Sequence, residues 1–184
     1  YQYCYKKSDD PYFETVFNKS KEIHKITEGS FNPSIMPLVN YYGFGYEKSK
    51  KIDKVDTSFI RKTLPLINFD DISFKPDSTG TLWCLEKKFP ESKIDFSAIA
   101  KGYGVDLVAG YLEENNIKNY LVEIGGELIG RGVNDRNESW VVGISRPSEN
   151  AELTEVELLL SISNASMATS GNYRNFYESQ GQKY

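Results

Sequence analysis

Residues 94–106 constrain the fold most, because a strand-like run passes there through small residues directly into a helical pattern. The strand-like run ends near Phe96, and hydrophobic residues take helical spacing from Ala98 to Asn115. Strand-like and helical runs are interspersed along the rest of the 184 residues. This order predicts an α/β (α+β) fold with a mixed β-sheet and packed helices, in a chain long enough to bury a core.

Periodicity and cap residues predict the other elements. Asp10 and Pro11 mark the start of a helix that Gly29 ends, and Asp56 caps a shorter helix. Strands are expected over residues 72–75, 81–86, 93–96, 119–124, 140–144 and 153–162. The core stripe of the long helix is expected to consist of Leu107, Val108, Tyr111 and Leu112.

Composition excludes several classes of protein. The chain has 22 basic and 26 acidic residues, and its net charge of -4 argues against a nucleic-acid partner. Aromatic residues make up 14% of the chain, which argues against disorder. The mean hydropathy is -0.50, and no apolar run approaches the roughly 18–20 residues that a membrane span needs.

Histidine and cysteine are scarce, which limits the chemistry further. His24 is the only histidine, so a His-rich zinc site is impossible within the chain. Its place inside the first expected helix favours a structural role for His24 over a catalytic one. Cys4 and Cys84 are the two cysteines; they exclude a Cys-based zinc site but allow one disulfide bond. Cysteine usage does not indicate a redox compartment.

The strand-to-helix segment also carries the strongest chemical signal. Small residues before the helix let backbone N–H groups approach an anion, which a helix N-terminus also favours. Lys101 adds a positive charge suited to phosphate, and Asp95 could accept hydrogen bonds from a ligand or orient a metal-bound water. Neither a P-loop nor a dinucleotide-binding fingerprint is present. From the residues alone, a phosphate site and a glycine-softened helix start without a ligand are equally supported.

Three further segments could contribute to a site. Gly125 and Gly126 follow a β-rich run and are interpreted first as a hairpin turn. Residues 167–174 offer hydroxyls, a glycine and Arg174, which suits phosphate or carboxylate recognition, although a surface loop is the simpler interpretation. Residues 31–46 are rich in aromatics and are interpreted as a packed loop in preference to a wall for a planar ligand. Together with the strand-to-helix segment they outline a site for phosphates and a flat ring.

These segments, in this order, resemble the ApbE family, the FAD:protein FMN transferases. The resemblance covers nearly the whole chain, and it is specific because several motifs occur in the right order, whereas each motif alone would be weak. The matching segments are residues 27–32, 37–45, 95–106, 122–127, 140–144 and 168–175.

The resemblance implies a fold of the family's own type and a magnesium-dependent reaction that moves FMN from FAD to a Thr or Ser hydroxyl of a partner protein, with release of AMP. It makes FAD the substrate and Mg²⁺ the metal cofactor. By position, the residues expected to bind the flavin nucleotide or to shape its pocket are Ser30, Phe31, Asn32, Asp95, Lys101, Gly125, Gly126, Thr169 and Ser170. Ala98 matches a position that ligates magnesium, here through its backbone carbonyl. The resemblance identifies no catalytic residue within the chain.

The chain also departs from the family pattern. Asn32 stands where the family usually has Asp. Family members begin well before Tyr1 and continue past Tyr184 into a segment whose His, Asp and Thr residues complete the metal site. We therefore expect residues 1–184 to form a single ApbE-like domain that lacks N- and C-terminal parts and to transfer FMN inefficiently on their own.

The resemblance further implies a partner and a location. The expected partner is a flavin-acceptor protein with a Thr or Ser target, and no nucleic acid is expected. The expected location is the bacterial periplasm or cell envelope, as an inner-membrane lipoprotein tethered through an N-terminal lipid anchor, while the chain itself shows no signal sequence. Three alternatives stay open: an FAD pyrophosphatase that yields FMN and AMP, a non-catalytic flavin-binding protein, and a plain α/β domain whose glycines only make turns.

Overall fold

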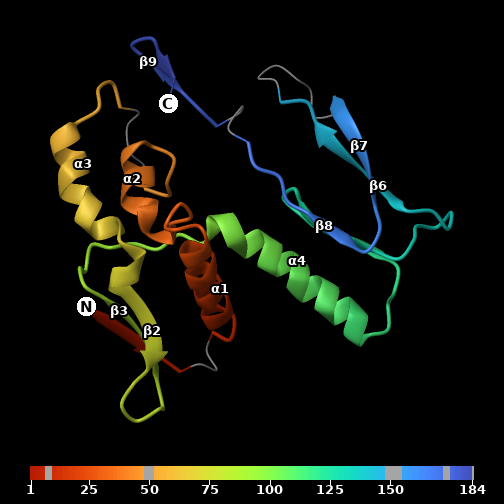
Figure 1. The fold of residues 1–184 in the computed structure, drawn as a ribbon, viewed down its shortest axis with the longest axis horizontal. Coiled ribbons are helices and arrows are strands. Elements are labelled where there is room, and N and C mark those ends of the chain that lie inside the picture. Colours follow the sequence, from red (N-terminus) through yellow and green to blue (C-terminus); the bar gives the residue numbers. More distant parts are fainter. Residues whose placement is uncertain (7–9, 48–51, 148–154, 172–174, 184) are drawn as a thin grey trace. The chain divides into compact units, whose positions relative to one another are not determined.

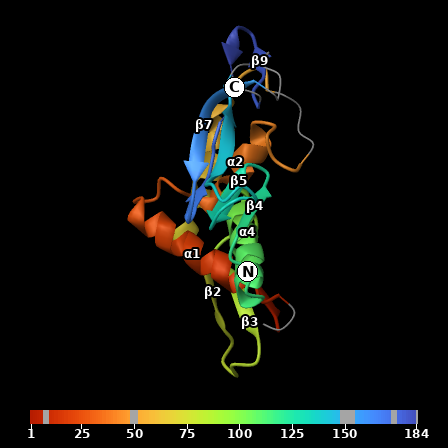
Figure 2. The ribbon, with the colours of Figure 1, turned by 90° about the vertical axis from the view of Figure 1, so that its right-hand side faces the viewer.

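The computed structural model describes residues 1–6, 10–47, 52–147, 155–171 and 175–183, which form two compact units. The first unit comprises Tyr1–Ala98 together with Tyr177–Tyr184, and the second comprises Ile99–Phe176. Figure 1 and Figure 2 show the elements of each unit, and each unit is described by itself. The single domain expected over residues 1–184 stays a prediction.

A three-stranded antiparallel sheet organises the first unit (Figure 1). Its strands lie in the order β1 (Gln2–Tyr5), β3 (Trp83–Lys87), β2 (Ile72–Pro76). In the turn between β2 and β3, Oδ1 of Asp77 accepts hydrogen bonds from the backbone N–H groups of Thr81 (2.9 Å) and Leu82 (3.0 Å). A side-chain acceptor of this kind fixes a turn locally, and it sets the register in which Lys75 lies opposite Cys84.

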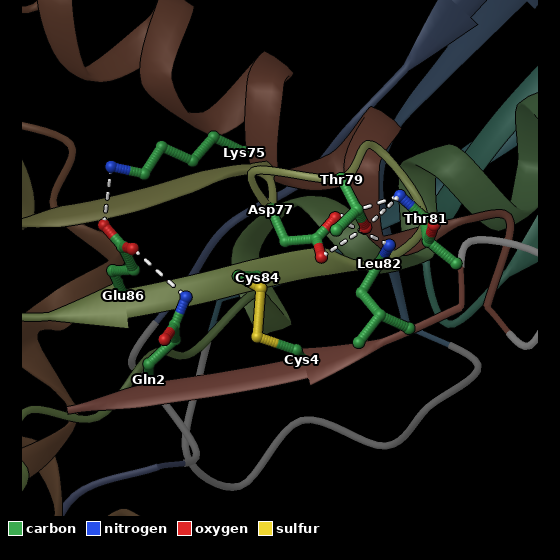
Figure 3. The surroundings of a disulfide bond; sticks show 9 residues. All are labelled: Gln2, Cys4, Lys75, Asp77, Thr79, Thr81, Leu82, Cys84 and Glu86. Carbon is green, nitrogen blue, oxygen red and sulfur yellow. Dashed lines mark hydrogen bonds and ion pairs between the residues drawn. A yellow bond between two sulfur atoms is a disulfide. The ribbon is translucent and has the colours of Figure 1, made fainter.

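A disulfide bond and a shared carboxylate tie β1 to this sheet (Figure 3). Cys4 and Cys84 lie opposite each other in the antiparallel register, with Cα atoms 4.1 Å apart, and form the bond that the sequence left open. The carboxylate of Glu86 accepts from Gln2 Nε2 (3.2 Å) and pairs with Lys75 Nζ (2.7 Å), so it connects all three strands. The disulfide joins residues 80 apart in sequence, for which the chain-entropy estimate is roughly 4 kcal/mol of stabilisation.

Helix α1 (Phe13–Ile26) packs an aromatic face against the sheet of the first unit. Oδ1 of Asp10 accepts from the backbone N–H groups of Tyr12 (3.1 Å) and Phe13 (3.0 Å), which confirms the helix start expected from the sequence. The aromatic core around α1 consists of Tyr5, Phe13, Phe17, Phe69, Phe74 and Phe96. Neighbouring ring centroids in it lie 5.0 to 6.2 Å apart, the spacing of favourable aromatic contacts.

Short elements complete the first unit. They are the 3-10 helices η2 (Pro33–Ile35), η3 (Leu64–Ile67) and η4 (Phe69–Asp71), the helices α2 (Met36–Tyr41) and α3 (Thr57–Thr63), and the paired strands β9 (Glu178–Ser179) and β10 (Gln182–Lys183). Oδ1 of Asp56 caps α3, as the sequence predicts. The rings of Tyr41 and Phe59 stack with centroids 4.4 Å apart and join α2 to α3. The aromatic segment 31–46 therefore contains helical turns that pack on the core and is not only a loop.

Helix α4 and two antiparallel sheets form the second unit (Figure 2). The elements are α4 (Ser97–Glu114), β4 (Tyr120–Ile124), β5 (Glu127–Arg131), β6 (Trp140–Ser145), β7 (Val156–Ile162) and β8 (Ala165–Met167). One sheet has the order β4-β5-β8, and the other is the β6–β7 hairpin. Val105 and Ala109 of α4 pack against Tyr120 and Ile129 of the first of these sheets.

The α/β (α+β) fold class is confirmed, but the sheets are antiparallel and not mixed as the sequence suggested. The pairs β2–β3, β4–β5 and β6–β7 are each consecutive in the chain. Parallel pairing requires a long crossover connection, whereas consecutive strands joined by a turn pair antiparallel. Consecutive order in the chain therefore accounts for the antiparallel pairing of β2–β3, β4–β5 and β6–β7, whereas β1–β3 and β5–β8 are antiparallel pairs between strands that are not consecutive.

Two further expectations are wrong. Residues 93–96 form no strand; the backbone N–H of Asp95 donates instead to the Pro33 carbonyl at 2.8 Å. On α4, Leu107, Val108 and Tyr111 are exposed, and the second unit buries Val105 and Ala109, with Leu112 packed beside them. Small side chains let the helix approach the sheet closely, so the buried face is narrower and less bulky than the hydrophobic pattern suggested.

The cross-strand disulfide generates a stability prediction. Replacing both Cys4 and Cys84 by Ala should lower the free energy of unfolding by about 2–4 kcal/mol, because the unfolded chain regains the freedom of an 80-residue loop. Denaturant titration of the wild-type chain with and without a reducing agent should show the same loss. The double variant is the control, since a reducing agent should leave its transition unchanged; equal transitions for all samples would contradict the prediction.

Tyr5 generates a pH prediction. Its hydroxyl is buried without a hydrogen-bond partner among the described residues, and burial, followed by the charges of Asp10 and Glu14, raises the pKa of Tyr5 from its ordinary 10.0 to about 12. Between these two values Tyr5 loses its proton in the unfolded chain but keeps it in the folded chain. The contribution of Tyr5 to the free energy of unfolding is therefore complete below about pH 10 and is lost as the pH rises toward about 12. In denaturant titrations across this window, Tyr5→Phe should decline less steeply than the wild type. An equal decline would show that other groups cause it.

Candidate functional site

The expected site residues lie on both units, and the structure describes the geometry of each group separately. The group on the first unit consists of Ser30, Phe31, Asn32, Asp95 and Ala98. The group on the second unit consists of Lys101, Gly125, Gly126, Thr169 and Ser170. The assignment of these residues to a site stays a prediction, because it rests on their positions in the sequence.

The segment Ser30–Asn32 is held in place by the last turn of α1. The chain leaves the helix through Glu28 and Gly29, which have positive φ values of 51° and 83°. The backbone N–H of Phe31 then donates to Oγ1 of Thr27 (3.0 Å), and the Phe31 carbonyl lies 2.6 Å from Nδ1 of His24. Both polar backbone groups of Phe31 are therefore bound by side chains at the end of α1, the carbonyl by His24 and the N–H by the C-cap residue Thr27.

Asn32 uses its side chain to cap η2 and to join it to the end of η3. Its Oδ1 accepts from the backbone N–H (3.0 Å) and the hydroxyl (2.6 Å) of Ser34, which caps η2. Its Nδ2 donates to the Ile67 carbonyl at 2.7 Å. Aspartate could supply the cap but not the second bond, because a carboxylate has no N–H to donate. This explains physically why asparagine suits the position where the family usually has Asp.

Asp95 forms the cap of α4. Its Oδ1 accepts from the backbone N–H of Ser97 at 2.8 Å and also from the Ser97 hydroxyl. The carboxylate that could contact a ligand is thus already bound to the first residue of the helix. Ala98 follows in the first turn of α4 and is exposed.

Magnesium finds few ligands among these residues. Mg²⁺ prefers six oxygen ligands in octahedral geometry and is usually held by carboxylates, waters and phosphates. Within the described part of the chain, no three His, Cys, Asp or Glu side chains cluster so that they could hold a metal ion. The Ala98 carbonyl and the engaged Asp95 carboxylate do not by themselves make a magnesium site.

Lys101 is held at the turn between β4 and β5. Its Nζ lies 2.6 Å from Oε2 of Glu127 and donates to the Gly125 carbonyl at 3.0 Å. Glu127 is only 16% exposed, so this carboxylate holds the ammonium group from the buried side. Because a lysine side chain is flexible, its ammonium group takes a single position only where partners such as Glu127 and the Gly125 carbonyl bind it.

Two glycines make this arrangement possible. Gly125 and Gly126 have φ values of 56° and 95°, as the two central residues of a type I′ hairpin turn require, so the predicted turn is confirmed. A Cβ atom would lie 3.2 Å from the Lys101 side chain at Gly125 and 3.2 Å from Oγ1 of Thr169 at Gly126. Oε1 of Glu123 accepts from the backbone N–H of Gly126 at 2.5 Å. The turn thus has room for Lys101 on one side and for Thr169 on the other.

A cavity of about 390 Å³ adjoins this turn in the second unit. Its lining residues are Gly102, Val105, Asp106, Glu127, Leu128, Ser166, Met167 and Ala168. Its lining contains both polar and apolar side chains, and its volume lies within the range of small-molecule sites. Thr169 and Ser170 follow the lining residues along the chain and are exposed. Arg174, which the sequence suggested for phosphate recognition, lies outside the described residues.

Comparison with known proteins fixes the family. Residues 6–184 match the sequence profile of the ApbE family. The chain belongs to the ApbE family. Its relatives include the FAD:protein FMN transferases of Haemophilus influenzae, 34% identical over 172 residues, and of Vibrio cholerae, 34% identical over 170 residues. These alignments cover 94% and 92% of this chain but 49% and 48% of the relatives, so the chain spans about half their length.

Solved ApbE structures share the fold. The flavin transferase ApbE from Vibrio cholerae superposes with a TM-score of 0.73 at 32% identity, over 88% of this chain and 49% of the other. The flavinyl transferase ApbE from Pseudomonas stutzeri, in its apo form, gives a TM-score of 0.78 at 26% identity, over 99% and 52%. Among the described residues, no helix has the length and apolarity needed to cross a membrane.

Sequence reasoning missed several residues around the ApbE motifs. Glu127 stands beside the two glycines, and its partnership with Lys101 became visible only when the turn brought residues 26 apart together. Thr27 and His24 hold Phe31, although the sequence suggested no role for His24 beyond its helix. The position of Thr27, four residues before Phe31, is only a weak sequence signal that its hydroxyl binds the Phe31 backbone N–H. Nothing in the sequence indicates that His24 binds the Phe31 carbonyl.

The double role of Asn32 generates a prediction. Asn32→Asp keeps the cap on Ser34 but removes the donor to Ile67 and sets a carboxylate oxygen against that carbonyl. The free energy of unfolding should fall by about 1–3 kcal/mol, the cost of leaving a partly buried group unpaired. Urea titration of the variant measures this, with Asn68→Asp as the control, because that exposed side chain only accepts a bond from Asp70. Equal stability of the wild type and Asn32→Asp would contradict the prediction.

Proposed function

We propose that this chain is part of an FAD:protein FMN transferase, which moves FMN from FAD to a Thr or Ser hydroxyl of a partner protein and releases AMP. The observation that carries the proposal is the match to the FAD:protein FMN transferase of Haemophilus influenzae over 94% of the chain. The local geometry supports it, since the second unit holds a lysine ammonium beside a glycine turn and a cavity.

The reaction follows from the chemistry of the two substrates. The acceptor hydroxyl oxygen bonds to the phosphorus of the FMN half, and the bond from that phosphorus to the bridging oxygen breaks. AMP leaves with the bridging oxygen, and the hydroxyl proton passes to a base. Such transfers need positioning and charge stabilisation more than covalent chemistry from the protein. A bound divalent cation would neutralise charge on the pyrophosphate.

Lys101 is proposed to contribute positive charge to the site. Glu127 and the Gly125 carbonyl hold its ammonium group at the turn, so it need not be ordered when a ligand arrives. The absence of side chains at Gly125 and Gly126 leaves the space that the Lys101 and Thr169 side chains occupy beside the turn. We assign to this group the binding of the pyrophosphate of FAD, and to Ser30, Phe31, Asn32 and Asp95 further contacts with the nucleotide.

Magnesium, the acceptor and the location belong to the same proposal. Mg²⁺ is proposed as cofactor, with Ala98 as one of its ligands. The disulfide between Cys4 and Cys84 supports an oxidising compartment such as the bacterial periplasm or cell envelope, because disulfides persist there and are rare in the cytosol. An inner-membrane lipid anchor on the protein and a flavin-acceptor protein as its partner complete the proposal.

The central experiment follows the products. The chain, FAD, Mg²⁺ and a Thr-containing acceptor protein are incubated, and AMP, free FMN and the mass of the acceptor are measured. A second sample uses the chain extended by the part of the Vibrio cholerae relative that follows the region aligned with this chain. We expect FAD binding by both, and AMP release with a covalently flavinylated acceptor from the extended chain. Free FMN would indicate a pyrophosphatase, FAD binding without AMP from either sample would indicate a flavin-binding protein, and no binding would refute the proposal.

The Lys101 assignment gives a sharper prediction. Lys101→Met should raise the Kd for FAD about tenfold or more, because a charge-assisted contact to the pyrophosphate is lost. Lys118→Met, at an exposed lysine of the same unit, is the matched control and should leave the Kd unchanged. Quenching of flavin fluorescence measures both, and riboflavin, which lacks phosphate, should not distinguish the variants. Equal FAD affinity of Lys101→Met and wild type would remove Lys101 from the site.

A further inference from the structure

His24 occupies a position that the proposed function does not explain. Its side chain is 12% exposed, and its ring lies edge-on to Phe69, with centroids 5.5 Å apart. A Cβ atom at Gly29 would lie 3.6 Å from the ring, so the chain turns closely over it after α1 ends. The imidazole is therefore enclosed between a core aromatic ring and the turn that leads into Ser30–Asn32.

The two ring nitrogens of His24 face different partners. Nδ1 lies 2.6 Å from the Phe31 carbonyl, and Nε2 lies 3.9 Å from Oδ1 of Asp70, whose side chain is 77% exposed. A carbonyl oxygen only accepts hydrogen bonds, so Nδ1 must carry a proton. In neutral imidazole this leaves Nε2 without a proton, and in the protonated ring both nitrogens donate. The bond to Phe31 is present in either form.

This bond controls the direction of the next peptide group. In a trans peptide the carbonyl and the following N–H point to opposite sides. Because His24 binds the carbonyl of Phe31, the backbone N–H of Asn32 is directed away from the imidazole. Thr27 holds the N–H of Phe31 in the same way, so the peptide groups on both sides of Phe31 have fixed orientations.

We propose that His24 is a positioning residue, which holds the Phe31 carbonyl through Nδ1 and so presents the backbone N–H of Asn32 to an acceptor oxygen of the flavin nucleotide. This inference rests on the proposed function, because it takes Ser30–Asn32 as part of the FAD site. It assigns to the single histidine a role in binding that requires no contact with the ligand and no catalytic chemistry.

The first part of the test uses the fact that the chain has one histidine. Long-range proton–nitrogen NMR correlation of the imidazole gives its protonation pattern without an assignment problem. Nδ1 should be protonated in the free chain at every pH at which the chain is folded. The pattern with only Nε2 protonated would overturn the proposal, whatever the binding data show.

The second part compares two replacements. The side-chain amide nitrogen of His24→Asn can take the place of Nδ1, whereas that of His24→Gln reaches the place of Nε2. His24→Asn should keep the Kd for FAD within about twofold of wild type, and His24→Gln should raise it about tenfold, the effect of one hydrogen bond lost from a pre-organised segment. Asp70→Asn, which changes the partner of Nε2 and of the Lys21 ammonium group but leaves the Nδ1 side unchanged, should bind FAD like the wild type.

The outcomes separate this inference from the proposed function. The NMR signal of the Asn32 amide should shift on addition of FAD in the wild type and in His24→Asn, and much less in His24→Gln at the same FAD concentration. If the wild type binds FAD and all variants bind equally, this inference alone is wrong. If both His24 variants lose affinity equally, the imidazole acts by packing and not through Nδ1, which also overturns it. If the wild type does not bind FAD, the proposed function fails and this inference fails with it.

Discussion

The first unit depends on a small network of hydrogen bonds made by the backbone and side chains around Asn32 and Pro33. Asn32 donates to Ile67, at the end of η3, and caps η2 through Ser34. The carbonyl of the adjacent Pro33 accepts from Asp95, which in turn caps α4. Pro33 and Ser34 are among the fully buried residues, so water cannot replace these bonds. Three segments far apart in the sequence thus meet at two consecutive residues, and three of the expected nucleotide contacts, Ser30, Phe31 and Asn32, lie on the same short piece of chain.

Local chemistry explains which elements the sequence could predict. Asp10 and Asp56 act on backbone groups within three residues, so the starts of α1 and α3 follow from the sequence. Gly125 and Gly126 specify their turn by conformational freedom alone. In contrast, β1 forms because Cys4 and its neighbours pair with β3 about 80 residues away, and no local pattern encodes such a partner. Residues 93–96 have strand-like composition but form no strand, and the backbone N–H of Asp95 donates to the Pro33 carbonyl and not to a neighbouring strand.

The candidate site likewise contains residues that local sequence signals predict and residues whose role depends on distant partners. Lys101 could be picked out from its place in a helix after small residues, because that signal is local. The role of Glu127, which determines where the Lys101 ammonium group lies, could not be predicted in this way. Glu127 contacts Lys101 only when β4 and β5 have formed their hairpin. His24 was interpreted as structural because a lone histidine in a helix usually is. Its contact with Phe31 depends on the left-handed turn at Gly29, whose path the sequence does not specify.

The ion pair between Lys101 and Glu127 fixes the position of the ammonium group more than it stabilises the fold. Lys101 is 46% exposed, and ion pairs at such positions contribute little to folding, commonly 0–1 kcal/mol. A phosphate that approaches the ammonium group would still meet a fixed charge, because Glu127 is mostly buried and cannot turn away into solvent. The negative net charge of the chain is no obstacle to such a site, since screening by salt confines these interactions to within about 10 Å. The proposed pyrophosphate site of this acidic chain therefore depends on local geometry, in which Glu127 fixes the Lys101 ammonium group and Glu123 binds the Gly126 N–H of the turn.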